Sequence, residues 1–455
     1  MKAIITIILS ITLLTLLASC SAAGGSTTAL TDVQLEEQAR EFVTQLAAGQ
    51  FKEAREDFDM TMNLALSQQK LEETWAALQE QAGPFEKQGD VRIETEAPYK
   101  IVFVTCRFGM GALDVRVVFD QKGKISGLFF QPASDSSAMA PDYVTPEYAD
   151  VTLFQEEDAT IGSGEWQLPG TLTLPTGAGP FPAVVLVHGS GPNDRDETIG
   201  PNRVFKDLAW GLASRGIAVL RYEKRTREYG ERFTGEILNN LTLKGEVIDD
   251  ALAAITWLQA RPEIDPSQIY VIGHSLGATV APRIAAQNIK IAGLVLLAGA
   301  TRPIEDLMLE QSTYLANADG AIDKDEDKAL KDLQKMVDQV KQLPDQEKID
   351  PAEIILGAGP AYWLDLMAYN PVATAESLTI PMLILQGERD YQVTMTDFAA
   401  WQAALSGRQN VTLKTYPALN HLFIAGQGPS LPEEYQIMGH VDATVINDIV
   451  GWIQP

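Results

Sequence analysis

The chain has 455 residues, of which 45% are hydrophobic and 21% charged, an ordinary globular composition with enough length for two or three domains. Its 61 acidic side chains outnumber its 35 basic ones and give a formal net charge of −26. This charge disfavours binding to nucleic acid or to the anionic face of a membrane, and the acidity itself does not point to a particular reaction.

The chain begins with a short targeting segment. Lys2 is followed by an apolar run over residues 3–17, and Cys20 comes directly after the small-residue ending LAS. The run is shorter than the ~20 apolar residues needed to span a bilayer. The ending resembles the lipobox of bacterial lipoproteins, which implies a signal peptide over residues 1–19, lipidation of Cys20 and a tether over residues 20–30. We expect an extracytoplasmic protein, lipid-anchored to the bacterial cell envelope, or secreted if the lipobox is not used.

Residues 31–131 have the patterns of a small α+β domain. Apolar residues recur at helical spacing from 32 to 75, and from 91 to 130 the period changes to two, as in an antiparallel meander. The helices, the segment GQFKEAREDFD and the ending GKISGLFFQP resemble the nuclear-transport-factor-like domains found ahead of some bacterial hydrolases. We interpret the domain as a structural or substrate-shaping part of the protein. Cys106 lies in a predicted strand and is interpreted as a core residue.

A linker over residues 132–148, rich in Pro, Ser and Ala, leads into a larger domain over residues 149–455. Short apolar runs alternate there with helical segments, which predicts a mainly parallel sheet covered by helices on both faces. The predicted strands are residues 171–174, 183–187, 217–220, 269–272, 291–297, 382–385 and 411–414, and the predicted helices are residues 205–214, 245–258, 278–287, 398–405 and 441–452.

A long, charged, helix-favouring insertion over residues 301–375 interrupts this alternation. It lies between two predicted strands, at the edge where such a sheet usually carries its site, so we interpret it as a helical cap. Within it, residues 315–326 nearly match the ligand spacing of a calcium loop. Because Leu315 occupies the first ligand position, we interpret this segment as a solvated loop and helix start, and we predict no metal site.

The segment QIYVIGHSLGATVAP, residues 268–282, predicts a strand, a tight turn and a helix. Its centre has the pattern Gly-x-Ser-x-Gly, in which Ser275 lies on a strained turn with its hydroxyl exposed. A side chain at Gly273 or Gly277 would collide with the neighbouring strand or helix. Taken alone, the pattern also fits an ordinary strand-to-helix turn that happens to contain a serine.

A serine hydroxyl is a poor nucleophile at neutral pH, so Ser275 needs a base, and the base needs an orienting acid. The chain has four histidines. Two of them, His188 and His274, lie inside glycine motifs, and His440 belongs to the start of the terminal helix. The candidate base is therefore His421, in a loop after the last predicted strand.

The acid is expected in the loop GERD, residues 387–390, which follows a predicted strand. Glu388 and Asp390 are both candidates, and a surface ion pair with Arg389 is the non-catalytic alternative. The order serine, acid, histidine along the chain is that of α/β-hydrolases and differs from the orders of the two familiar serine protease folds.

An oxyanion that forms during acyl transfer also needs hydrogen-bond donors. The turn HGSGP follows a predicted strand and can direct a backbone N–H of Gly189 or Ser190 at the developing charge. The second donor is expected to be the backbone N–H of Leu276, the residue after the serine. The polar run 193–197 and the charged residues between 221 and 225 are interpreted as contacts that hold loops.

Residues 170–455 resemble the α/β-hydrolase serine esterases, on the motifs HGSG, GHSLG, GERD and LNH. The segment from FPAVVLVHGSGPNDRDETIG to RYEKRTR resembles a bacterial carboxylesterase subgroup that carries an extra amino-terminal domain. This resemblance implies an α/β-hydrolase fold and a triad of Ser275, Asp390 and His421, and it favours Asp390 over Glu388. It also implies hydrolysis of small or medium carboxylic esters through an acyl-enzyme, with no metal or organic cofactor.

Two other functions fit the same motifs. Peptidases related to the prolyl oligopeptidases and acyl thioesterases share them, although those peptidases usually carry a β-propeller, which a front domain of about 100 residues is too small to form. A non-catalytic envelope lipoprotein that binds a ligand is the third possibility. A vestigial site of that kind usually lacks a triad member, and none is missing from this sequence.

Overall fold

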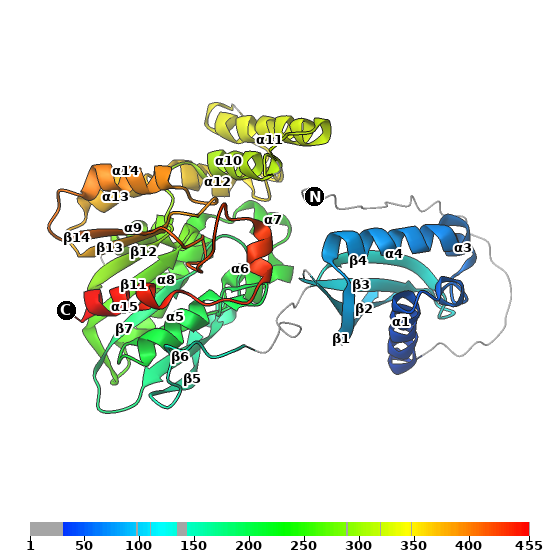
Figure 1. Ribbon diagram of the computed structural model, residues 1–455, viewed down its shortest axis with the longest axis horizontal. Coiled ribbons are helices and arrows are strands. Elements are labelled where there is room, and N and C mark those ends of the chain that lie inside the picture. Colours follow the sequence, from blue (N-terminus) through cyan, green and yellow to red (C-terminus); the bar gives the residue numbers. More distant parts are fainter. Residues whose placement is uncertain are drawn as a thin grey trace. The chain divides into compact units, whose positions relative to one another are not determined.

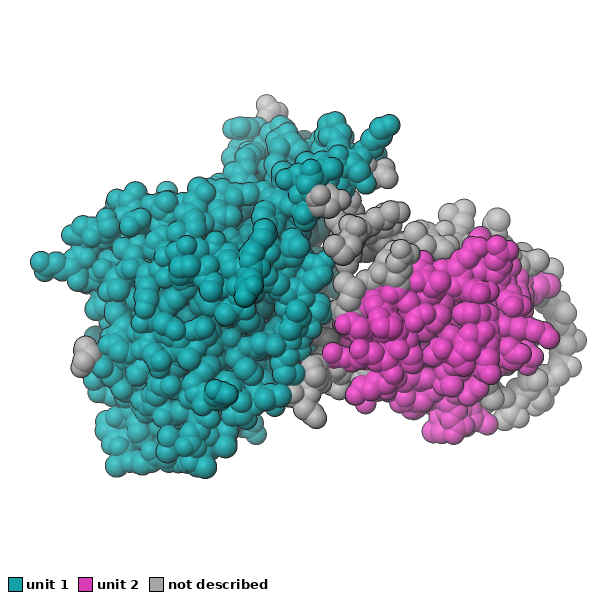
Figure 2. Space-filling view, viewed as in Figure 1, with its two compact units in different colours: residues 1, 143–455 teal, residues 2–142 magenta. Residues whose placement is uncertain are grey.

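The computed structural model describes residues 31–454, except 97–98, 110, 134–142, 288–289, 319 and 347 (Figure 1). The predicted signal peptide, Cys20 and the tether lie outside these residues, as does most of the predicted linker. The chain divides between residues 142 and 143 into two compact units (Figure 2). Across the described ranges, every helix is too short or too polar to cross a bilayer.

In the amino-terminal unit, helices pack on one face of a four-stranded antiparallel sheet with the order β1-β2-β3-β4 (Figure 1). Buried Leu35, Phe42 and Leu46 of α1 share a core with the inward-facing residues of β2, because alternate side chains of a strand point to the same face. Cys106 belongs to this core, as predicted, and burial raises the pKa of its thiol to about 12. The elements are α1 (Asp32–Ala47), α2 (Phe51–Ala54), α3 (Met60–Ala65), α4 (Gln68–Ala82), β1 (Phe85–Glu96), β2 (Tyr99–Phe108), β3 (Gly111–Phe119) and β4 (Ile125–Pro132).

The larger unit is built on an eight-stranded sheet with the order β14-β13-β12-β11-β7-β10-β6-β5. The six strands from β14 to β10 run parallel, and β6 and β5 add antiparallel pairs at one edge. The expected α/β-hydrolase fold with a mainly parallel sheet, preceded in the chain by a small α+β domain, is confirmed. The strands are β5 (Phe154–Ile161), β6 (Leu168–Pro175), β7 (Phe181–Val187), β10 (Ala218–Tyr222), β11 (Ile264–His274), β12 (Gly293–Leu297), β13 (Met382–Gly387) and β14 (Val411–Tyr416), with a separate short pair β8 (Thr198–Ile199) and β9 (Asn202–Arg203).

Helices cover both faces of this sheet. Residues of α5 and α15 pack with Val184 and Leu186 of β7, whereas residues of α8, α9 and α14 pack with Val185 and Val187 of the same strand. A strand buried on both faces has no polar alternation, which explains the continuous apolar run at 183–187. The helices are α5 (Val204–Ala213), α8 (Asp249–Gln259), α9 (Leu276–Ala285), α14 (Met395–Leu405) and α15 (Ala443–Ile453), with short α6 (Arg225–Glu228) and α7 (Gly235–Asn239) and a π-helical turn η4 (Lys244–Ile248).

A helical insertion lies between β12 and β13. Its helices are α10 (Ile304–Ala316), α11 (Lys324–Gln342), α12 (Pro360–Met367) and α13 (Pro371–Ser377). At the start of α11 the Asp323 N–H donates to Glu326 Oε2 at 2.8 Å, and the Glu326 N–H donates to Asp323 Oδ1 at 2.9 Å. This reciprocal pair is a capping box, so the predicted helix start is confirmed at these two carboxylates. Asp319 of the same segment lies outside the described residues.

Candidate active site

Ser275 occupies a sharp turn between β11 and α9. Its φ of 54° and ψ of −117° are costly for a residue with a side chain, and such strain is typical of functional sites. The turn closes so tightly that a Cβ on Gly273 would lie 2.3 Å from the Gly277 carbonyl carbon, and a Cβ on Gly277 would lie 2.0 Å from the Val187 oxygen. Both glycines of the motif are therefore required by the local geometry.

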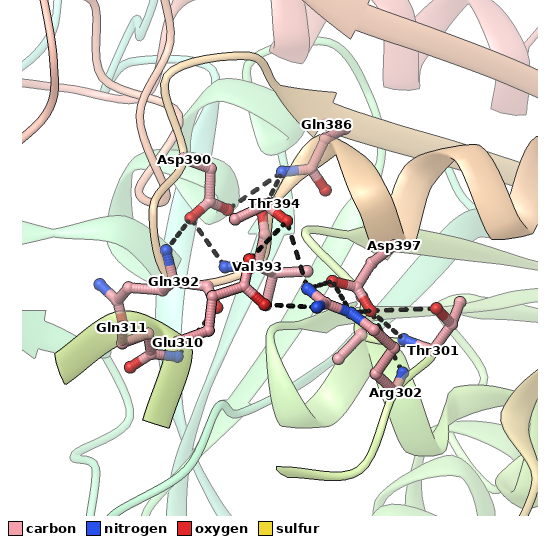
Figure 3. A network of polar contacts seen from close by, with 12 residues as sticks. Thr301, Arg302, Glu310, Gln311, Gln386, Asp390, Gln392, Val393, Thr394 and Asp397 are labelled. Atoms are coloured by element: carbon pink, nitrogen blue, oxygen red, sulfur yellow. Dashed lines mark hydrogen bonds and ion pairs between the residues drawn. The ribbon is translucent and has the colours of Figure 1, made fainter. Parts of the chain in front are cut away.

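Asp390 and His421 are brought together at the carboxyl ends of β13 and β14. Asp390 Oδ2 is 2.7 Å from His421 Nδ1, and both side chains are buried. The carboxylate also accepts hydrogen bonds from Gln386 Nε2 at 3.1 Å and from the backbone N–H groups of Gln392 and Val393 at 2.8 and 3.0 Å (Figure 3). Four donors therefore hold Asp390 as an oriented acceptor for the imidazole.

Glu388, the other candidate acid, and Arg389, the candidate for an ion pair within this loop, have other partners. Glu388 accepts a hydrogen bond from Thr415 Oγ1 at 2.7 Å, away from the imidazole. The guanidinium of Arg389 pairs with Glu434 and donates to the Gly428 carbonyl at 2.7 Å. Asp390 is therefore the carboxylate of this loop that orients His421.

Ser275 and His421 are not joined by a hydrogen bond in the described part of the chain, although the residue before Ser275 contacts His421. The ring of His421 lies 4.9 Å, between centroids, from the ring of His274, the residue before Ser275. Ser275 itself is half-buried. Catalytic hydrogen bonds often tighten only when substrate binds. The structure thus contains the expected contact between Asp390 and His421. Within the described residues it contains no hydrogen bond between His421 and Ser275.

The glycine-rich turn after β7 corrects one expectation. The Gly189 N–H donates to Glu197 Oε1 at 2.6 Å, so the prediction that this N–H faces an oxyanion is wrong. The Gly189 carbonyl accepts a hydrogen bond from Lys224 Nζ at 2.8 Å. Ser190, the next residue, is exposed and is the remaining candidate donor of this turn. The other candidate donor, Leu276, is the first residue of α9.

A second pair of carboxylate and imidazole contacts the pair of Asp390 and His421, and the sequence did not reveal it. His274 Nδ1 is 2.9 Å from Glu197 Oε2, and His274 Nε2 is 2.9 Å from the backbone oxygen of His421. Burial opposes the charge on both groups, but their mutual attraction prevails, so the pKa of His274 is raised and that of Glu197 is lowered. The available signal was that His274 ends β11 and that Glu197 lies in the segment after β7, the strand next to β11 in the sheet.

The polar residues around this turn hold loops, as the sequence suggested. Asp194 Oδ1 accepts the Thr198 N–H at 2.9 Å, and Lys224 Nζ lies 3.2 Å from Glu246 Oε1. Further ion pairs join Arg195 to Glu223, Arg221 to Asp196 and Glu156, and Arg225 to Asp250.

The first helix of the insertion is tied to the acid loop (Figure 3). Gln311 Nε2 of α10 donates to the Gln392 carbonyl at 2.8 Å, and Thr394 Oγ1 donates to Glu310 at 3.3 Å. The side chain of Arg302 pairs with Glu310 and, at 2.7 Å, with fully buried Asp397. The insertion is therefore anchored next to Asp390. Over the described ranges, we find no group of three His, Cys, Asp or Glu side chains placed to hold a metal ion.

Comparisons with known proteins agree with this architecture. Residues 184–430, more than half of the chain, match the model of the alpha/beta hydrolase family, and residues 39–128 match a family described as protein of unknown function (DUF3887). Esterase EstD of Thermotoga maritima is 42% identical over 418 residues, which cover 92% of this chain and 95% of the relative.

Solved structures resemble the chain more distantly. An esterase of Pyrococcus furiosus is 18% identical with a TM-score of 0.41 and covers 69% of this chain and 97% of its own. Est1E from Butyrivibrio proteoclasticus is 16% identical with a TM-score of 0.41 and covers 66% and 99%. On the family match and on the 42% identity across nearly the whole length, the chain belongs to the α/β hydrolase family.

Proposed function

We propose that this protein is a serine esterase that cleaves small or medium carboxylic esters through an acyl-enzyme at Ser275. The observation that carries the proposal is the buried bond between His421 and Asp390, located next to the strained turn of Ser275. The relative that is 42% identical over nearly the whole chain bears the name esterase, which supports the same reaction class.

The reaction starts when His421 Nε2 takes the proton of Ser275 Oγ as the oxygen attacks the ester carbonyl. Asp390 accepts the Nδ1 proton of the ring, which fixes the tautomer and stabilises the imidazolium that forms. The N–H groups of Leu276 and Ser190 donate to the developing oxyanion. His421 then protonates the leaving alcohol, and a water activated by the same ring releases the acid from Ser275.

We also propose that the enzyme is lipid-anchored at Cys20 and acts outside the cytoplasm. This proposal depends on the LASC ending of the apolar amino-terminal run. Expressed in its bacterial host, the protein should sediment with membranes, whereas Cys20→Ser should move it to the soluble fraction. Soluble wild-type protein would contradict the anchor and leave the esterase proposal intact.

A substrate panel tests the reaction class. Esters, thioesters and amides with the same acyl group should be turned over in the order ester first and amide last, with an optimum at short or medium acyl chains. The Ser275→Ala variant should lose this turnover. Faster cleavage of aminoacyl amides would indicate a peptidase and faster cleavage of thioesters a thioesterase, and absence of all turnover in folded wild-type protein would favour a binding protein.

A further inference from the structure

We propose that Glu197 and His274 act together as a positioning pair that fixes three active-site segments relative to one another: the glycine-rich turn, the serine turn and the loop of the base. The inference rests on the proposed function, because it assigns roles relative to Ser275 and His421. Neither residue needs to touch substrate.

The pair forms one continuous chain of hydrogen bonds through the site. The Gly189 N–H donates to Glu197 Oε1 at 2.6 Å, and Glu197 Oε2 lies 2.9 Å from His274 Nδ1. On the other side of the ring, His274 Nε2 lies 2.9 Å from the backbone oxygen of His421. His274 also directly precedes Ser275, so one ring joins the segments of nucleophile, base and glycine-rich turn.

The chemistry of the partners fixes one proton of the His274 ring. A backbone carbonyl only accepts, so His274 Nε2 must carry a proton that it donates to His421. The remaining nitrogen faces a carboxylate, and the pair is neutral overall whether the second proton lies on the ring or on Glu197. His274 therefore has no nitrogen left for proton transfer with substrate, which distinguishes it from a catalytic histidine.

The glycine-rich turn is held from its other side as well. Lys224 Nζ donates to the Gly189 carbonyl at 2.8 Å and lies 3.2 Å from Glu246, which accepts a hydrogen bond from Tyr362 of α12 at 2.7 Å. The Gly189 carbonyl and the Ser190 N–H belong to the same planar trans peptide and point in opposite directions. Holding the carbonyl therefore sets the direction in which Ser190 presents its N–H.

Burial explains why this arrangement is a rigid support. Glu197 is 1% exposed and His274 is 2% exposed. A buried charge is retained only with its partner, so both side chains are confined to the geometry in which they meet. A misplacement of about 1 Å at a reacting group can cost on the order of 100-fold in rate, so support of this kind has kinetic weight.

The test compares His274→Leu, Glu197→Leu and the double variant with His274→Gln, whose amide can still donate to the His421 carbonyl. We expect kcat to fall about 100-fold in each leucine variant, with KM within about threefold, and the double variant to lose little more than either single one because the two residues act as a unit. His274→Gln should recover much of the loss, to within about tenfold of wild type.

His440→Leu is the matched control. His440 Nδ1 lies 3.0 Å from Asp207 Oδ1, a bond of the same kind near the start of α15, and the residue has no role in the proposed site. Its kcat per folded molecule should equal that of wild type, with the folded fraction taken from near-ultraviolet circular dichroism. Wild-type kcat in the leucine variants, or losses that add in the double variant, would overturn the inference.

Two further measurements keep the test decisive. If the leucine variants do not fold, Glu197→Asp and His274→Asn replace them, because these shorter polar side chains no longer reach both of their partners, and wild-type kcat in both would overturn the positioning role. Ser275→Ala separates this inference from the proposed function: turnover that survives in Ser275→Ala refutes the proposed function, whereas its loss combined with unaffected His274 variants refutes the positioning pair alone.

Discussion

The two buried pairs of carboxylate and imidazole in this protein look alike and differ in one respect. Asp390 and His421 meet at 2.7 Å, and Glu197 and His274 meet at 2.9 Å. Within the described part of the chain, His421 has no hydrogen-bond partner at its second nitrogen, whereas the second nitrogen of His274 donates to a carbonyl. In the mechanism proposed above, the same two functional groups serve once as a base with its acid and once as a support, and the partner of the second imidazole nitrogen distinguishes the two roles.

The largest expected effect is on the first pair. Asp390→Asn should lower kcat by about 10⁴-fold, because an amide at this position favours the wrong tautomer of His421. Its thermal unfolding should stay close to that of wild type, since Gln386, Gln392 and Val393 still surround the side chain. Steady-state kinetics on folded protein check this, and a loss of less than tenfold would remove Asp390 from the triad.

The second pair should respond in stability as well as in rate. Glu197→Leu leaves His274 without its buried partner, and breaking a buried pair in this way typically destabilises a protein by about 3–5 kcal/mol. Urea unfolding of this variant next to Asp390→Asn measures the difference. Equal stabilities of the two variants would contradict the division of roles drawn here.

The stability contributed by the second pair should depend on pH within a defined window. The pKa of His274 is raised above its ordinary 6.5, so its contribution is complete below that pH and is lost as pH rises through the raised value. The pKa of Glu197 is lowered from its ordinary 4.5, so its contribution is complete above that pH and is lost as pH falls through the lowered value.

The difference in unfolding free energy between wild type and the double variant Glu197→Gln, His274→Gln should therefore be largest between about pH 4.5 and 6.5. Urea unfolding of both proteins, measured at about ten pH values between about 3 and 9, would show this maximum. A difference that stays constant over the whole range would mean that the pair carries no charge-dependent stability.

The smallest expected effect concerns Glu388. Its carboxylate accepts a hydrogen bond from Thr415 Oγ1 at 2.7 Å and does not contact His421. Glu388→Gln preserves that acceptor, so kcat should remain within about twofold of wild type. A large loss of activity would reopen the choice between the two acidic residues of this loop.

The sequence predicted most of the fold because its strands are buried on both faces and so have continuous apolar runs. It missed β5, whose segment FQEEDATI lies at the sheet edge and exposes most of its polar residues. The contact between Asp390 and His421 was foreseen from motifs and from the position of each loop after its strand. Topology placed both loops at one edge of the sheet, and the family resemblance selected Asp390 over Glu388.

The second pair was not readable in the same way. Glu197 and His274 are 77 positions apart, and each lies in a segment with another evident purpose: an acidic loop and a glycine motif. The fold brings them together because β7 and β11 are neighbours. The same contact changed the assignment of Gly189, since the sequence cannot show that a distant carboxylate occupies its N–H.

The central claim is that Ser275 carries the acyl group, and mass spectrometry of trapped protein tests it directly. Wild-type enzyme treated with a fluorophosphonate, or quenched with acid during ester turnover, should gain one adduct on the peptide that contains Ser275. The Ser275→Ala variant should gain none and should have no ester turnover. An adduct on another residue, or undiminished turnover in Ser275→Ala, would contradict the account.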